Sequence, residues 1–128
     1  MTWATAAIGS VPFRVDISIG GHALVADETA MGGGADEGPT PYDFLLAGLG
    51  ACTAIGLKKF AEDRRWPLEG LDVDLRFINR SGALGIERIL SIVGDLDQAQ
   101  RDQLLDAANQ TPMTTLLSRG FRIHTEWA

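Results

Sequence analysis

The stretch Thr40-Pro-Tyr-Asp-Phe-Leu-Leu-Ala-Gly-Leu-Gly-Ala-Cys-Thr-Ala-Ile-Gly-Leu57 decides the fold of this chain. Its first residues predict a helix start, because Thr40 supplies a capping hydroxyl, Pro41 suits the first helical position and Asp43 follows the cap by three residues. After Asp43, fourteen residues pass before the next charge, at Lys58. They are too few to span a bilayer and predict instead the core helix of a globular protein.

The predicted helix is apolar on every side and must therefore be covered all round. A chain of 128 residues suits a single domain, residues 1–128, with one sizeable core and few spare elements. A second copy of the same helix is the economical cover for the side that the chain's own sheet leaves open, which predicts a homodimer. Gly48, Gly50 and Gly56 would permit close backbone approach, although each costs roughly 1 kcal/mol of helix propensity relative to alanine.

Alternating apolar and polar residues on both sides of this helix predict strands. Upstream, residues 12–27 alternate about Gly20-Gly21 and predict a β-hairpin, while residues 28–39 contain four glycines and predict a flexible connection. Downstream, the patterns predict antiparallel strands at 71–78 and 86–93, helices at 95–109 and 111–119, and a last strand at 121–127. The sequence therefore predicts an α+β fold with the order ββ-α-ββ-αα-β.

Composition and charge exclude several classes of partner. A net charge of -6 and a pI near 4.7 would repel phosphate backbones and anionic lipids, so neither nucleic acid nor a membrane surface is an expected partner. The first ten residues lack the features of a secretory signal, which predicts the cytoplasm. One cysteine and two distant histidines give no metal-ligand spacing, and no nucleotide-binding loop occurs, so no metal or cofactor is expected.

The segment from Gly38 to Thr53, followed by Trp66-Pro-Leu-Glu-Gly70, resembles the hallmark of the OsmC family, whose better-known branch is the Ohr proteins of organic hydroperoxide resistance. Weaker similarity extends over most of the chain. The resemblance implies an OsmC-like fold in which two chains intertwine as a homodimer, with the two cysteine-bearing helices packed centrally. It also implies a thiol peroxidase of the oxidative stress response that reduces organic hydroperoxides through Cys52.

The sequence departs from this family at the second cysteine. In active members that cysteine precedes a proline at the start of a late helix, and here the corresponding residue is Thr111, ahead of Pro112. A hydroxyl cannot close a disulfide with Cys52. The resemblance therefore implies at most a one-cysteine cycle, in which an external thiol reduces the sulfenic acid formed at Cys52.

Each candidate site residue also has a structural interpretation. Cys52 lies beyond the first helical turn, in an apolar setting that disfavours thiolate, so it is either a buried packing residue or a nucleophile assisted by a cation. The resemblance points to Arg14 as that cation, although the residues alone favour a solvent-facing Arg14. Asp43 lies near the sequence position at which the family carries a glutamate that orients this arginine. Along the helix, however, Asp43 is roughly 13 Å from Cys52 and on the opposite side. Asp43 also suits a capping box with Thr40.

Two functions remain open from the sequence. The first is the one-cysteine hydroperoxide reductase, with Cys52, Arg14 and Asp43 as its site. The second is a catalytically lapsed relative that binds a small apolar ligand at the dimer interface, where Cys52 only packs and Thr111 marks the loss of activity.

Overall fold

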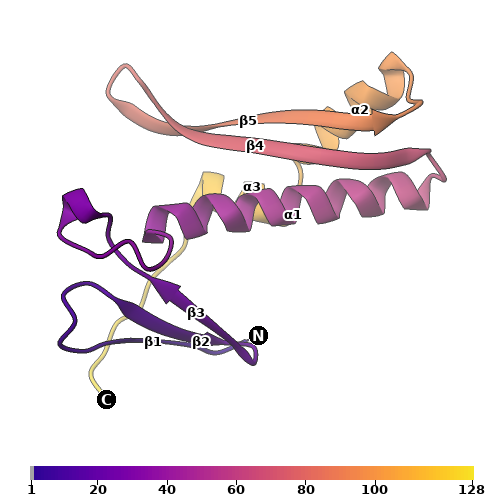
Figure 1. Ribbon diagram of the computed structural model, residues 1–128. Coiled ribbons are helices and arrows are strands. Elements are labelled where there is room, and N and C mark those ends of the chain that lie inside the picture. Colours follow the sequence, from indigo (N-terminus) through magenta and orange to yellow (C-terminus); the bar gives the residue numbers. More distant parts are fainter. Residues whose placement is uncertain (1) are drawn as a thin grey trace. The chain divides into compact units, whose positions relative to one another are not determined.

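The structure, a computed structural model, describes residues 2–128 (Figure 1). In chain order its elements are β1 (Ala4–Ile8), β2 (Val15–Ile19), β3 (His22–Ala26), η1 (Ala30–Gly32), α1 (Pro41–Asp63), β4 (Leu68–Arg80), β5 (Ala83–Gly94), α2 (Gln98–Ala108) and α3 (Pro112–Arg119). They fall into two compact units, one ending at Ala47 and the other running from Gly48 to Ala128. Each unit contains one antiparallel sheet, which confirms the predicted α+β class.

The first unit contains the predicted hairpin and one strand that was not predicted. Strands β2 and β3 pair through the turn at Gly20 and Gly21, whose φ angles of 55° and 79° favour glycine. Strand β1 pairs with the other edge of β2 over its full length. The sequence of β1, Ala-Thr-Ala-Ala-Ile, is too weakly alternating to signal a strand, so its pairing with β2 decides its conformation.

The connection after β3 is ordered around the carboxylate of Asp27. This side chain is 3% exposed and accepts hydrogen bonds from the backbone N–H groups of Glu28, Ala35 and Glu37, at 2.7, 3.3 and 3.2 Å. Within the loop, the short helix η1 is capped by the Thr29 hydroxyl. The prediction of a flexible connection was wrong, because the glycine count carried no information about this buried acceptor.

Two glycines of the same loop are required by close packing rather than by flexibility. A Cβ atom on Gly34 would lie 2.1 Å from the carbonyl oxygen of Glu28, and one on Gly38 would lie 2.1 Å from that of Val25. Real Cβ contacts are not this short, so any larger residue would displace the loop backbone.

Helix α1 begins at the predicted cap and is longer than the predicted apolar stretch. Asp43 N–H donates to Thr40 Oγ1 at 3.2 Å and Thr40 N–H donates to an Asp43 carboxylate oxygen at 3.0 Å, which confirms the capping box. The helix has 23 residues, and one 18-residue window has a mean hydropathy of 1.4. By length and composition alone it could cross a membrane, although the core helix of a soluble protein passes the same test.

The second unit packs α1, the β4-β5 hairpin and α2 around an apolar core. The hairpin turns at Ser81 and Gly82, both with positive φ, as a two-residue turn requires. Alternate residues of β4 and β5 are more buried and form the inner face of this hairpin. The buried core residues are Leu57, Ala61, Leu68, Leu96, Leu104 and Ala108. In the isolated chain, burial on α1 is confined to the stripe Leu49, Thr53, Leu57 and Ala61.

Two of the three predicted close-packing glycines of α1 face neighbours within the same chain. A Cβ atom on Gly50 would lie 2.9 Å from Leu75 Cδ1 on β4, and one on Gly56 would lie 3.3 Å from Thr111 Cγ2. Helix α1 therefore approaches the inner face of the hairpin at Gly50 and the start of α3 at Gly56. These contacts account for two of the helix's glycines without a second copy.

The predicted last strand does not form. Residues 121–127 alternate as a strand should, but in the structure they are exposed and have no regular secondary structure. A strand needs a neighbour to satisfy its backbone N–H and C=O groups, and within residues 2–128 no strand pairs with this segment. The observed order is therefore βββ-α-ββ-αα, with one strand gained at the start and one lost at the end.

Candidate functional site

Cys52 is half-buried on α1, beside one of the most buried residues of the chain. Its neighbour Thr53 has no exposed surface, and the Thr53 hydroxyl donates to the carbonyl of Leu49 at 2.7 Å. The same hydroxyl oxygen accepts a hydrogen bond from Arg88 Nη1 at 2.9 Å. Strand β5 thus brings a guanidinium to the helix turn that carries the cysteine.

Arg88 joins several elements of the second unit. It lies on the inner face of β5, opposite Leu75 of β4, the residue that Gly50 of α1 approaches. Its Nη1 also donates to Thr114 Oγ1 on α3 at 2.9 Å, and its Nη2 donates to the carbonyl of Ala108 at 2.8 Å. Ala108 is the last residue of α2, so the guanidinium also lies at the negative end of that helix.

The charge of Arg88 is not neutralised by a carboxylate. Each hydrogen-bond acceptor of Arg88 is an uncharged oxygen, including that of Asn109 at 3.4 Å, and no ion pair of residues 2–128 involves it. Burial lowers the pKa of Arg88 below its usual value, while Coulomb attraction to Cys52 acts in the opposite direction. Among the causes of this pKa shift, Cys52 is the ionisable side chain whose negative form favours the charged guanidinium.

Thr111, where the family resemblance implies a second cysteine, contacts both helix α1 and Thr114. It is 6% exposed and packs against Gly56, one helical turn after Cys52 on the same side of α1. Its hydroxyl oxygen lies 2.7 Å from that of Thr114, which binds Arg88. The structure therefore brings two of the predicted residues, Cys52 and Thr111, to one region of α1.

Arg14 and Asp43 lie in the unit that ends at Ala47, and each is engaged locally. The Arg14 guanidinium contacts Glu37 at 2.5 Å and Asp16 at 3.2 Å. These two carboxylates raise the pKa of Arg14, chiefly through their hydrogen bonds. Asp43 forms the capping box with Thr40, and no ion pair within residues 2–128 joins it to Arg14. In a single chain, Glu37 is the carboxylate that orients Arg14 most closely.

Arg88 was missed by the sequence reasoning, although the sequence carries a signal for it. Ile86, Leu90 and Ile92 alternate on one face of β5, and Arg88 occupies the same face between Ile86 and Leu90. A charged residue within an apolar alternation must find polar partners inside the protein, because burying it unpaired is costly. The apolar alternation alone is enough to predict the strand, and it does not indicate a role for Arg88.

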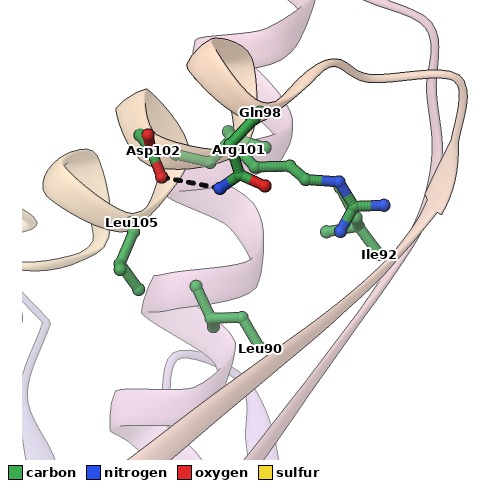
Figure 2. Close-up of a pocket in the computed structure, with 7 residues that line it drawn as sticks. Leu90, Ile92, Gln98, Arg101, Asp102 and Leu105 are labelled. Atoms are coloured by element: carbon green, nitrogen blue, oxygen red, sulfur yellow. Dashed lines mark hydrogen bonds between the residues drawn. The ribbon is translucent and has the colours of Figure 1, made fainter.

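A shallow pocket lies elsewhere in the second unit, between β5 and α2 (Figure 2). Its volume is about 230 Å³, with Leu90 and Ile92 from the strand and Gln98, Arg101 and Asp102 on the helix side. Gln98 Nε2 donates to Asp102 at 2.8 Å. The residues that line the pocket do not include Cys52, Arg88 or the threonines that bind Arg88. It is therefore separate from the cysteine site.

The cysteine site offers thiol chemistry. Within residues 2–128, no group of three or more His, Cys, Asp or Glu side chains is arranged to hold a metal ion. The site contains a half-buried thiol, an arginine that forms no ion pair with any carboxylate of residues 2–128, and hydroxyl groups that hold the guanidinium. A cation near a thiol favours the thiolate, which is the nucleophilic form of cysteine.

Comparison with known proteins agrees with this fold. The family model described as OsmC-like protein matches residues 33–126, whereas no curated protein matches the chain. Similar solved structures include an OsmC-like protein from Mycoplasma pneumoniae, with 16% identity, a TM-score of 0.77 and coverage of 92% of this chain and 87% of that one. An organic hydroperoxide resistance protein from Legionella pneumophila has 19% identity and a TM-score of 0.72, with coverage of 91% and 88%. The organic hydroperoxide resistance protein OhrB of Bacillus subtilis has 21% identity and a TM-score of 0.62, with coverage of 94% and 91%. Because the family model matches most of its length, the chain belongs to the OsmC-like protein family.

Proposed function

We propose that the protein is a thiol-dependent peroxidase that reduces small organic hydroperoxides through Cys52 in a one-cysteine cycle. The observation that carries this proposal is the hydrogen bond from Arg88 Nη1 to Thr53, the residue next to the half-buried Cys52, made by a guanidinium that forms no ion pair within residues 2–128. Membership of the OsmC-like family supports the same reaction class, and two of the similar structures are described as organic hydroperoxide resistance proteins.

The proposed cycle uses one protein sulfur and two external thiol groups. The Cys52 thiolate attacks one oxygen of the hydroperoxide, an S–O bond forms, the O–O bond breaks, and the alkoxide leaves as an alcohol after taking a proton. Cys52 is thereby oxidised by two electrons to sulfenic acid. An external thiol then condenses with the sulfenic acid to give a mixed disulfide and water. A second external thiol group attacks the external sulfur of that mixed disulfide, so the Cys52 thiol leaves in its reduced form and the two external sulfurs are joined as a disulfide.

Arg14 and Asp43 remain part of the proposal because of the family resemblance. Arg14 would supply a further positive charge to the site once released from Glu37, and Asp43 would serve across a dimer rather than beside its own Cys52. Their present engagements, with two carboxylates for Arg14 and with a capping box for Asp43, mean that these roles require rearrangement or a second chain.

We infer that the working form is a homodimer of single-domain chains in the cytoplasm. Support comes from α1, in which only 22% of the most apolar window is buried in the isolated chain, and from exposed apolar side chains on it such as Ile55. A second copy would cover this surface and turn α1 into the core helix of a soluble protein.

The test is hydroperoxide consumption by purified protein. Cumene hydroperoxide is supplied with dithiothreitol or a dihydrolipoyl donor, and sulfenic acid is trapped with dimedone and located by mass spectrometry. We expect stoichiometric trapping at Cys52, turnover in the presence of the thiol, and neither in Cys52→Ser. Trapping no faster than with free cysteine would contradict the proposal.

The alternative is a lapsed relative that binds a small apolar ligand at the dimer interface. Thr111 favours it, because a hydroxyl replaces the resolving thiol. In that case Cys52→Ala would leave dimer stability and ligand retention unchanged, and no hydroperoxide would be consumed. Measurable turnover that disappears in Cys52→Ala decides against this alternative.

A further inference from the structure

The guanidinium of Arg88 is held in place by hydroxyl and carbonyl oxygens from three helices. We propose that Arg88 is the cation that stabilises the Cys52 thiolate from within the same chain, and that Thr114 and Thr111 are positioning residues that hold it there. This inference rests on the proposed function and names the side chains that prepare its nucleophile.

Arg88 lies beside the turn of α1 that carries Cys52. Its Nη1 donates to Thr53, the residue that follows Cys52 on α1, so the hydrogen bond fixes the charge next to the cysteine's own turn. Thr53 is fully buried and its hydroxyl is tied to Leu49, so this acceptor has little freedom to move. The Coulomb interaction between Arg88 and Cys52 agrees with that placement.

The positive charge of Arg88 remains available to interact with a thiolate. Arginines paired with carboxylates in this chain, such as Arg14 and Arg76, have a nearby negative charge that cancels most of their field. Arg88 has dipoles instead: hydroxyls, an amide oxygen and the carbonyl end of α2. Dipoles hold a guanidinium without neutralising it, so a thiolate at Cys52 would supply a counter-charge that no ion pair within residues 2–128 provides.

Thr111, which stands where the family resemblance implies a second cysteine, supports Thr114. Thr114 accepts from Arg88 and lies within hydrogen-bonding distance of both Thr111 and the carbonyl of Ala108, at 2.7 and 3.2 Å. A thiol at position 111 would be only a weak hydrogen-bonding partner for Thr114, whereas a hydroxyl is a good one. The threonine thus exchanges a resolving group for support of the cation, which suits a cycle resolved by external thiol.

The experiment measures thiolate reactivity in the full-length protein, without any peroxide. Alkylation by iodoacetamide is followed at pH 7 and low salt, together with the ultraviolet absorbance of the thiolate. Arg88→Met is expected to alkylate about tenfold more slowly and to lose thiolate absorbance, because one nearby charge is removed. Arg88→Lys, which keeps the charge, should recover most of the rate, and Arg80→Met at the exposed hairpin end should match the wild type.

The threonines are tested with isosteric variants. Thr114→Val removes one of the two acceptors of Arg88 Nη1 and should slow alkylation about threefold. Thr111→Val should slow it about twofold, because both substitutions loosen the guanidinium without removing it. Thr115→Val, on the same helix, is the matched control and should leave the rate unchanged. A merely structural role would not produce this order.

Two results would overturn the inference: a wild-type alkylation rate in folded Arg88→Met, or equal rates in Thr114→Val and Thr115→Val. If circular dichroism shows that Arg88→Met does not fold, Thr114→Val and Arg88→Lys decide in its place. Because alkylation needs no peroxide, an Arg88-dependent rate in a protein that consumes no hydroperoxide refutes the proposed function alone.

Discussion

Arg14 and Arg88 are two arginines in two regions of the molecule, and their surroundings differ in kind. Arg14, in the unit that ends at Ala47, is held by the carboxylates of Glu37 and Asp16 at its partly exposed surface. Arg88, in the unit from Gly48 to Ala128, is held by uncharged oxygens on the inner face of a hairpin. The number of contacts therefore does not measure how strongly a cation acts on its surroundings, because carboxylates cancel its electric field whereas dipoles leave most of it in place.

The largest effect is expected when Thr111, which supports Arg88 through Thr114, is replaced by cysteine. Thr111→Cys places a thiol against α1 one turn from Cys52, at the position where the family resemblance places the second cysteine. We expect peroxide to convert most of this variant to a disulfide between Cys52 and the introduced cysteine, measured by non-reducing mass spectrometry. Dimedone trapping should fall correspondingly. Unchanged trapping with no disulfide would mean that the two positions do not meet.

The next effect is on stability and separates the two arginines directly. Arg88→Met removes several hydrogen bonds from a charged donor and leaves the Ala108 carbonyl without that partner, so the free energy of unfolding should fall by about 2–3 kcal/mol. Arg14→Met removes partly exposed ion pairs and should lower the free energy of unfolding much less, because solvent screens such pairs. Urea unfolding followed by circular dichroism measures both, and equal losses would remove the distinction.

A smaller effect concerns the loop that presents Glu37 to Arg14. Burial alone would raise the pKa of Asp27, but hydrogen bonds from the backbone of Glu37, Glu28 and Ala35, with the charge of Arg14, hold it below its usual 3.8. Because the folded pKa is depressed, the stabilisation is present above the unfolded value and is lost as pH falls through the folded one. The amide chemical shifts of these three donors should therefore titrate together below pH 3.8. In Asp27→Asn this shared titration should be absent, and donors that titrate independently would contradict the shared acceptor.

The smallest expected effect is Arg14→Met on the alkylation rate of Cys52. Since Glu37 and Asp16 already neutralise most of the Arg14 charge, removing it should change the rate less than about twofold. A loss as large as that of Arg88→Met would instead favour Arg14 as the activating cation, as the family resemblance implies. The alkylation rates of Arg14→Met and Arg88→Met, measured side by side, therefore show which of the two arginines activates Cys52.

Much of the fold could be predicted from local patterns. The hairpin at Gly20-Gly21, the Thr40 cap of α1, the strands β4 and β5 and the helices α2 and α3 each depend on residues close in sequence, and the structure confirms them. The first strand, which was not predicted, and the last strand, which was predicted but does not form, share a different cause. A strand exists by virtue of its neighbour, and neither the weak pattern of β1 nor the strong pattern of residues 121–127 shows which neighbour is available.

The candidate site could be predicted only in part. Cys52 and Thr111 stand out in the sequence through the family resemblance, whereas Arg88 acquires its role from contacts with residues 20 to 35 positions away. Such contacts depend on how β5 lies against three helices, which no local pattern encodes. The misplaced charge within an apolar alternation was nevertheless visible, and it marks the kind of position where a search for hidden partners should begin.

The two close-packed glycines of the loop after β3 carry a warning for evolutionary comparison. Because any side chain at Gly34 or Gly38 would collide with a backbone carbonyl, saturation mutagenesis should find these positions as intolerant as Cys52 itself. An alignment would then rank them among the most invariant residues of the chain. Their invariance would report the steric demands of a backbone, and it would be a mistake to read it as the signature of an active site.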